Sequence, residues 1–333
     1  SVSDYGANKA AIVIDNKRTE LIGNRSIVSD RKKYVVESGV GFTRYDYTLD
    51  GGIKCSRMIS VMPSENINEG NPCFLLTITI RNTSSSVRKL TFDEVVLPSF
   101  VPVNTQYIPE AERPFRYSYH TDVSFRCVNV TFDTHAQDFY RTALPDMPFI
   151  HEEDPQDLFV YSPDGFLSIL EDGVHVMMND VKIRSGETRV LYAVIGMSDS
   201  ETKKRAEEMI RKAERGQYGA YASLWKRNLP DFSDERDNVR RREMYWNSHM
   251  LVASAMYDGY VKETFSAQGG VWTDRYGENL SNVNHLHAAL PMCYANKDLA
   301  KSIIRYVMKH SDMLGRISAG NIGELATNGK IES

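Results

Sequence analysis

Neighbouring residues in one glycine-flanked segment carry the side chains that sugar chemistry needs. The segment GGVWTDRY covers residues 269–276. An aromatic ring offers a platform for a sugar ring, a carboxylic acid can protonate a leaving glycosidic oxygen, and a guanidinium binds paired oxygens. We therefore predict Asp274 as the general acid and Arg275 as a hydroxyl or phosphate ligand, with Trp272 and Tyr276 stacking on the sugar. The alternative is that Asp274 and Arg275 form a surface ion pair.

Two further carboxylates lie in segments that connect predicted helices. Glu278 follows Gly277, and Glu324 follows the sequence GNIG at 320–323. Cleavage of a glycosidic bond needs a base or a carboxylate nucleophile besides the acid. Inorganic phosphate can take that place as a co-substrate, and one acid is then enough. Glu278 and Glu324 are therefore further catalytic candidates, although Glu278 also fits a solvated turn.

No metal or organic cofactor is predicted. The cysteines form no Cys-x-x-Cys pair and have no histidine at ligand spacing; they are Cys55, Cys73, Cys127 and Cys293. His285 and His287 cannot face the same side of a helix, which favours a capping or core role over a metal pair. The sequence GVG at 39–41 precedes an aromatic strand, which argues against a nucleotide loop.

Composition excludes several classes of protein. The 333 residues are 41% hydrophobic and 25% charged, and 40 basic and 44 acidic side chains give a net charge of −4. Nucleic-acid binding normally needs clustered basic residues. Apolar runs such as 74–80 stop far short of the roughly 20 residues that a membrane span needs. We therefore expect a soluble protein, and the cytoplasm is favoured over the periplasm or secretion.

Residues 11 to about 197 follow a period of two, which predicts strands. Runs rich in Val, Ile, Thr, Tyr and Phe lie at 34–36, 43–49, 58–62, 75–80, 90–97, 124–132, 173–178 and 190–195. Asp50-Gly51 and Asp172-Gly173 are hairpin signals. Many short strands with such turns indicate an antiparallel β-sandwich over residues 1–197.

The period changes to that of helices at residue 198. The sequence SDSE at 198–201 matches a capping box, and Ala206, Met209, Ile210 and Ala213 share one helix face. Further helices are predicted at 221–226, 235–256, 283–294 and 298–310. We therefore expect a helical linker over 198–234 and an all-α part over 235–333.

Several dispersed motifs resemble one family of enzymes in their order along the chain. They are GVGFTRY at 39–45, LTITIRNTS at 76–84, IRSGET at 183–188, AVIG at 193–196 and YWN at 245–247. Together they resemble glycoside hydrolase family 94, the cellobiose and related disaccharide phosphorylases. More broadly, they resemble enzymes with a β-supersandwich before an (α/α)6 barrel, the six-hairpin glycosidases. The resemblance implies general acid cleavage or phosphorolysis of an oligosaccharide, and a homodimer.

Two departures from that family stand out. Counting back without a gap from the helix start at 296–300 to the family's general acid reaches Asn284, and an amide cannot donate that proton. The alternative is a gap, which puts Trp272, Asp274 and Arg275 at that site. Twelve barrel helices need roughly 300 residues or more, whereas about 90 follow Tyr245. We therefore expect a truncated chain or a second chain that completes the barrel. A non-catalytic carbohydrate-binding or structural protein stays the alternative.

Overall fold

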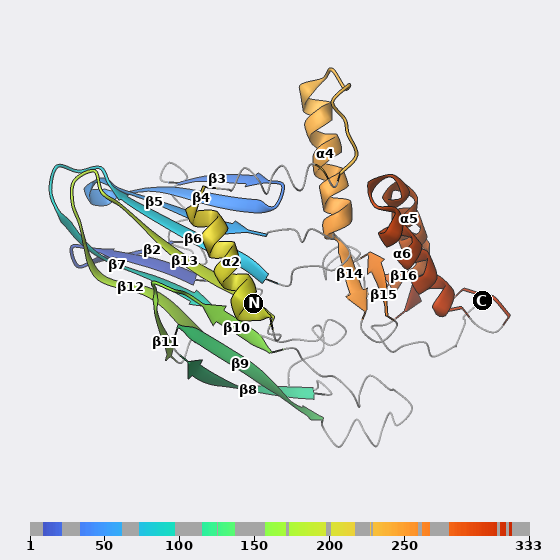
Figure 1. Ribbon diagram of the computed structural model, residues 1–333, viewed down its shortest axis with the longest axis horizontal. Coiled ribbons are helices and arrows are strands. Elements are labelled where there is room, and N and C mark those ends of the chain that lie inside the picture. The colour runs from blue at the N-terminus through green and yellow to red at the C-terminus, as the bar shows by residue number, and fades with distance from the viewer. Residues whose placement is uncertain are drawn as a thin grey trace.

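The computed structural model describes residues 9–21, 34–61, 73–96, 115–124, 126–136, 157–170, 173–197, 201–216, 227, 229–258, 262–266, 280–311, 314–317 and 320–321. In this part, two antiparallel sheets are followed by a smaller, mainly helical part beyond one end of the sheets (Figure 1). None of the described helices has the length and apolarity needed to cross a membrane.

The two sheets have five and eight strands. The first has the order β11 (Phe166–Leu170), β12 (Gly173–Ile183), β7 (Arg88–Val96), β1 (Lys9–Ile14) and β2 (Lys17–Glu20). The second has the order β3 (Tyr34–Gly39), β4 (Phe42–Leu49), β5 (Ile53–Ser60), β6 (Cys73–Asn82), β13 (Thr188–Met197), β10 (Leu158–Tyr161), β9 (Cys127–Ala136) and β8 (Phe115–Ser124). Alternate residues of both sheets form one buried core, which confirms the predicted sandwich.

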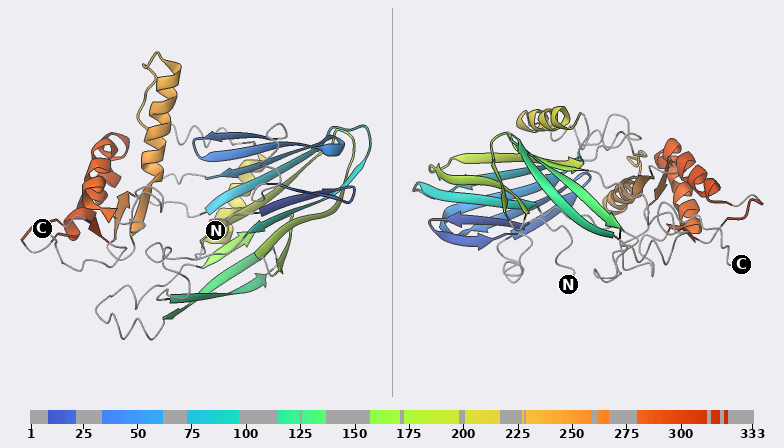
Figure 2. Two further views of the ribbon diagram at one scale, coloured as in Figure 1. Left: turned by 180° about the vertical axis from the view of Figure 1, so that it is seen from behind. Right: turned by 90° about the horizontal axis from the view of Figure 1, so that it is seen from below.

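Helix α2 (Thr202–Glu214) covers the outer face of the larger sheet (Figure 2). Met209 and Ile210 pack there against Leu75 of β6 and Val194 of β13. The middle strands are therefore apolar on both faces, which explains the nearly continuous apolar run at 74–80. The N-cap of α2 is Glu201, so the helix begins three residues later than the predicted capping box implies.

Most predicted strands lie within observed ones, with two differences. The predicted strand 124–132 lies mostly in β9, but its continuity is wrong, because it runs through the turn between β8 and β9. Arg126 takes a positive φ of 64° in that turn, where the sequence offers no glycine, asparagine or aspartate to mark it. The predicted strand 58–62 covers only the end of β5, which begins at Ile53.

Arg57 and Glu94 form an ion pair between the sheets, inside the core. The Arg57 side chain is 2% exposed and that of Glu94 is fully buried. The guanidinium donates to the carboxylate from Nε at 2.9 Å and from Nη2 at 2.5 Å. Burial and the negative charge of Glu94 raise the pKa of the neighbouring Cys55 thiol to about 12. The thiol therefore stays neutral at physiological pH, and the pair carries the charge of this core.

We expect that removing either partner of this pair leaves a buried, uncompensated charge. Arg57→Met or Glu94→Gln should lower the free energy of unfolding by about 3–5 kcal/mol, whereas the double change Arg57→Met/Glu94→Leu should recover much of that loss. Urea denaturation measures both. Removing the exposed pair of Lys17 and Asp50 is the control and should cost less than about 1 kcal/mol. Single changes as mild as this control would contradict the assignment.

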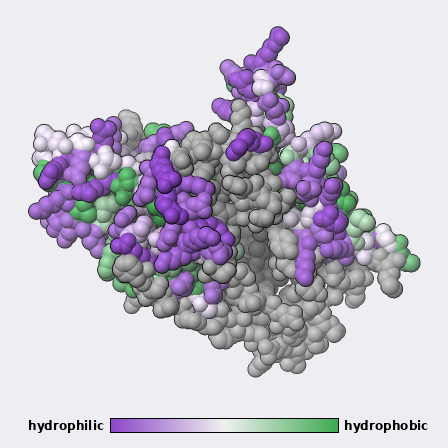
Figure 3. Space-filling model, in the orientation of Figure 1, coloured by the Kyte–Doolittle hydropathy of each residue, from purple (hydrophilic) through white to green (hydrophobic). Residues whose placement is uncertain are grey.

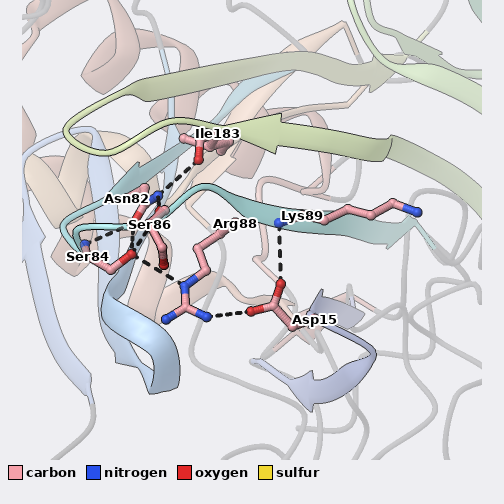
Figure 4. A network of polar contacts seen from close by, with 7 residues as sticks. All are labelled: Asp15, Asn82, Ser84, Ser86, Arg88, Lys89 and Ile183. Atoms are coloured by element: carbon pink, nitrogen blue, oxygen red, sulfur yellow. Dashed lines mark hydrogen bonds and ion pairs between the residues drawn. The ribbon is translucent and has the colours of Figure 1, made fainter.

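A polar network around Asn82 ties together the turns at the end of the sandwich opposite the helical part (Figure 4). The fully buried Asn82 side chain donates from Nδ2 to the carbonyls of Ser86 at 2.7 Å and Ile183 at 2.9 Å. Its Oδ1 accepts from the amide and hydroxyl of Ser84. A Cβ at Gly52, which has a φ of 78°, would lie 2.9 Å from that of Ser84. The β4–β5, β6–β7 and β12–β13 turns therefore meet around the Asn82 side-chain amide.

We predict that Asn82→Asp destabilises the fold, because a carboxylate cannot donate to the two carbonyls. Unpaired buried groups cost about 1–3 kcal/mol each, so the thermal midpoint should fall by several degrees. The exposed Ser85→Ala in the same turn is the matched control and should leave the midpoint unchanged. Equal midpoints for the two variants would show that the network contributes nothing to stability.

The part after residue 229 contains both helices and short strands. Its described elements are α4 (Asn238–Ala253), β14 (Ala255–Asp258), β15 (Glu263–Ser266), β16 (Leu280–Ser281), α5 (Asn282–Ala295), α6 (Lys297–Lys309) and β17 (Gly320–Asn321). Helices α5 and α6 confirm the predictions at 283–294 and 298–310. The prediction of an all-α part is wrong, because strand pairs β14–β15 and β16–β17 lie between and beside these helices.

The ends of these helices follow local hydrogen bonding. The Asp237 side chain caps α4 and that of Asn296 caps α6, each accepting from two backbone amides. Helix α4 ends at Ala253, short of the predicted 256, because the chain turns into β14. The predicted helix 221–226 lies outside the described residues.

Candidate functional site

The six residues singled out by the sequence lie outside the described part of the chain. They are the catalytic candidates Asp274, Glu278 and Glu324 and the binding candidates Trp272, Arg275 and Tyr276. The elements that border them are described. Residues 267–279 connect β15 to β16, and residues 322–333 follow β17. Because β16 pairs with β17 through Leu280 and Asn321, the two segments with candidate acids join the structure at one strand pair.

Glu263 on β15 is a buried carboxylate at this border. It accepts hydrogen bonds from Ser302 Oγ at 2.7 Å and Arg305 Nε at 2.9 Å, and it pairs with Lys309 Nζ at 2.9 Å. Ser302 also accepts from the Thr264 amide at 2.7 Å. The Glu263 side chain is 8% exposed. These bonds fasten β15, the strand that precedes residues 267–279, onto α6.

The charge of Glu263 is fixed by these partners. The hydrogen bond from Arg305 lowers the pKa of the Glu263 carboxyl to about 2, helped by Ser302 and Lys309 and opposed by burial. Glu263 is thus ionised at neutral pH and holds no proton to donate to a leaving group. It is the buried carboxylate of the described helical part. Sequence reasoning missed this cluster, although Ser302, Arg305 and Lys309 at i, i+3 and i+7 are the pattern of one helix face.

An aromatic cluster lies against the same strand. Phe265 of β15 and Tyr306 of α6 have ring centroids 5.3 Å apart, and Tyr306 lies 5.5 Å from His285 of α5 and 4.3 Å from His310. His310 donates from Nδ1 to the Tyr306 carbonyl at 2.7 Å. The four side chains join β15, α5 and the end of α6 into one packed unit.

His285 has the core role that its spacing from His287 predicts. Its side chain is fully buried, whereas His287 is exposed. Burial, together with the nearby His310, lowers the pKa of His285 to about 4. His285 is therefore neutral at physiological pH. The described residues contain no group of three or more His, Cys, Asp or Glu side chains placed to hold a metal ion.

We predict that stability falls as the pH drops from about 6.5 to 4. In that window the unfolded chain, with an ordinary His pKa near 6.5, takes up a proton that folded His285 excludes, which favours unfolding by up to about 3 kcal/mol. His285→Leu should flatten the stability profile in this window, whereas the exposed His287→Leu should not. Urea midpoints at pH 7, 5.5 and 4.5 measure the slope. A parallel profile for His285→Leu would contradict the assignment.

Comparison with known proteins shows a similarity in fold. No protein-family model matches the sequence, and no curated protein matches it. A solved structure of a putative kojibiose phosphorylase from the human microbiome is similar over 90% of this chain, with a TM-score of 0.53 and 10% identity. A polysaccharide lyase matches over 62% of this chain and 28% of its own, at 12% identity, but its TM-score of 0.29 is too low to support an argument.

The similarity to the phosphorylase is one of fold alone. A two-sheet antiparallel sandwich with helices after it is thus an architecture that also occurs in a carbohydrate-active protein. The chain spans 38% of the length of that phosphorylase.

Proposed function

We propose that this chain belongs to a carbohydrate-active enzyme that cleaves or phosphorolyses the glycosidic bonds of an oligosaccharide by general acid catalysis. The observation that supports this most is the fold similarity to the kojibiose phosphorylase over 90% of the chain. Fold similarity by itself does not specify chemistry. The proposal therefore also depends on the side chains of the segment 269–276.

At a finer level, the proposal is a phosphorylase of the family 94 type, whose helices form part of an (α/α)6 barrel. Two family-like motifs fall on defined elements. The sequence GVGFTRY at 39–45 spans the β3–β4 hairpin, and AVIG at 193–196 lies in β13. Inorganic phosphate would then be the attacking co-substrate, and the enzyme would act as a homodimer or with a second chain.

In this proposal Asp274 is the general acid, and Glu278 and Glu324 are the other catalytic candidates. Glu263, the buried carboxylate of the described helical part, is held ionised by Arg305, which supports an acid from another segment. Strand β16 follows the segment with Asp274 and Glu278, and its partner β17 precedes the segment with Glu324; this pairing supports the proposal that the three candidates belong to one site. Trp272 and Tyr276 would stack on the sugar, and Arg275 would bind hydroxyl or phosphate oxygens.

A non-catalytic carbohydrate-binding protein is the rival function. It is favoured by Asn284, the residue at the position where the family resemblance expects the acid. Asn284 lies exposed in the first turn of α5. A binding protein would show affinity for the sugar without turnover.

We predict that Asp274→Asn lowers kcat by a factor of about 100 or more, the usual contribution of a general acid. The natural gene product is incubated with disaccharides, with and without inorganic phosphate. Sugar phosphate and free sugar are then measured separately, which distinguishes phosphorolysis from hydrolysis. Trp272→Ala should instead mainly raise KM.

The exposed Glu243→Gln on α4 is the matched control and should retain wild-type kcat. Full activity of Asp274→Asn would remove Asp274 as the acid. Glu278→Gln and Glu324→Gln then decide between the remaining candidates. Sugar binding with no turnover on any substrate would support the binding protein.

A further inference from the structure

The end of the sandwich that lies away from the helical part carries an excess of positive charge (Figure 1). Four turns meet there, and the residues in and beside them are 14–20, 48–54, 81–89 and 180–189. These ranges contain nine lysines and arginines but only five aspartates and glutamates, whereas the whole chain has a net charge of −4. Hydrophilic residues gather at this end on the face that Figure 3 shows. Below, the four ranges are called the basic end.

All five carboxylates of the basic end are already paired with a cation. The nitrogen–oxygen distances lie between 2.5 and 3.1 Å, and the pairs are Arg88–Asp15, Lys17–Asp50, Arg18–Glu20, Lys89–Asp180 and Arg189–Glu187. Four exposed cations remain: Lys54, Arg81, Lys182 and Arg184. Within the described part of the chain, none of these four forms an ion pair. The uncompensated charge of the basic end therefore lies on these four side chains.

The register of the strands places like charges directly opposite each other. Lys54 of β5 lies opposite Arg81 of β6. In the other sheet, Lys89 of β7 lies opposite Lys182 of β12. Like charges at directly opposite positions destabilise a sheet. An anionic group bound between them would remove this repulsion, and both cations would form charge-assisted hydrogen bonds with it.

Threonine hydroxyls flank one of these like-charge pairs. Thr48 of β4 lies opposite Lys54, and Thr188 of β13 lies opposite Arg81, so the four residues form one row across four strands. Ile80, next to Arg81, is in the core, and the row therefore lies on the outer face of the sheet. All four side chains are exposed. A row of two cations between two hydroxyls can bind an acidic group and neutral hydroxyl groups of one ligand.

The turns that carry these side chains are fixed relative to one another. The Lys17–Asp50 ion pair connects the β1–β2 turn to the β4–β5 turn. Arg88 donates to Asp15 at 2.7 Å and so connects β7 to the β1–β2 turn (Figure 4). The buried Asn82 amide connects the β6–β7 turn to Ile183 at the end of β12. Because the surface is ordered before a ligand binds, less conformational entropy is lost on binding.

The composition of the basic end favours a sugar polymer over nucleic acid. Its four ranges contain no phenylalanine, tyrosine or tryptophan, whereas proteins that bind single-stranded nucleic acid stack its bases on aromatic rings. Exposed hydroxyl side chains are instead frequent in its turns: Thr83, Ser85, Ser86 and Ser185. Hydroxyl groups both donate and accept hydrogen bonds, as the hydroxyl groups of a sugar do.

We propose that the basic end is a non-catalytic binding surface for an anionic polysaccharide, whose carboxylate or sulfate groups bind Lys54, Arg81, Lys182 and Arg184. The choice of a polysaccharide rests on the proposed function, whereas the choice of an anion rests on the charges alone. Strands β16 and β17, which border the catalytic candidates, lie beyond the opposite end of the sandwich (Figure 1). A polymer bound at the basic end therefore holds the protein on its substrate without occupying the candidate site.

The test measures binding of the natural gene product to dextran sulfate, to polygalacturonate and to neutral dextran, at two salt concentrations. We expect binding to at least one charged polymer and none to neutral dextran. Lys54→Gln/Arg81→Gln should raise Kd for the charged polymer about tenfold and reduce its dependence on salt. Lys203→Gln/Arg211→Gln removes the same charge from exposed positions of α2 and should change Kd less than about twofold.

Two further measurements separate binding from folding and from catalysis. Lys182→Gln/Arg184→Gln, in a different turn, should weaken binding in the same way, and the thermal midpoints of both double variants should not fall, because like-charge repulsion is removed. Asp274→Asn should bind as tightly as the wild type. An inactive protein that still binds would therefore contradict only the proposed function, and an active protein that does not bind would contradict only this inference.

Three results would overturn the inference. The first is no binding to either charged polysaccharide. The second is an equal loss of affinity in the α2 control and in the variants of the basic end, which would mean that only total charge matters. The third is tighter binding of single-stranded oligothymidylate than of both polysaccharides, which would assign the surface to nucleic acid.

Discussion

The described sandwich depends on a buried charge pair that spans its two sheets. Arg57 enters the core from β5 and Glu94 from β7, and each neutralises the charge of the other and forms hydrogen bonds with it. A buried guanidinium without its carboxylate is far costlier than an apolar residue at the same position. The pair therefore favours one alignment of the sheets over shifted ones, because a shift of one residue on either strand would turn one charge away from the core. This specificity matters because the surrounding aliphatic side chains would tolerate several alignments.

In the helical part, ion pairs of a buried carboxylate likewise fix the position of a strand, β15. Glu263 is almost fully buried, but its partners Arg305 and Lys309 are half exposed, so its ion pairs fasten β15 to α6 with a smaller cost of desolvation. The aromatic cluster of Phe265, His285 and Tyr306 fills the space beside it. Charge fixes the position of β15 along α6, while the rings supply the apolar contact. The segment with the candidate acid Asp274 thus follows β15, a strand that is held by both ion pairs and aromatic contacts.

The sequence predicted best those features that depend on local periodicity. Strands β4, β6 and β13 and helices α5 and α6 could be predicted because burial of one face imposes a period of 2 or 3.6 on apolar residues. The β8–β9 turn at Arg126 was mispredicted, because its positive φ has no glycine to announce it. The helical period places Ser302, Arg305 and Lys309 on one face of α6, but it contains no signal for their partner Glu263, which lies about 40 positions away in the sequence. The residues with the strongest chemical signal, around Asp274, were predicted from the side-chain types within one short segment and stay predictions.

The contacts at the two ends of the sandwich indicate where a ligand site can be built. At one end, the side-chain amide of Asn82 forms hydrogen bonds with Ser84, Ser86 and Ile183. The polar groups of the turns there are therefore paired with one another. At the other end, the β3–β4 hairpin reaches the helical part, where Val40 packs against the cluster that contains Leu229 and Met292. Gly41 at this tip takes a positive φ of 78°, a left-handed conformation that favours glycine. In the described residues this end joins two parts of the chain, and ligand sites are common between such parts, which supports the proposal of a functional surface on the helical side of the sandwich.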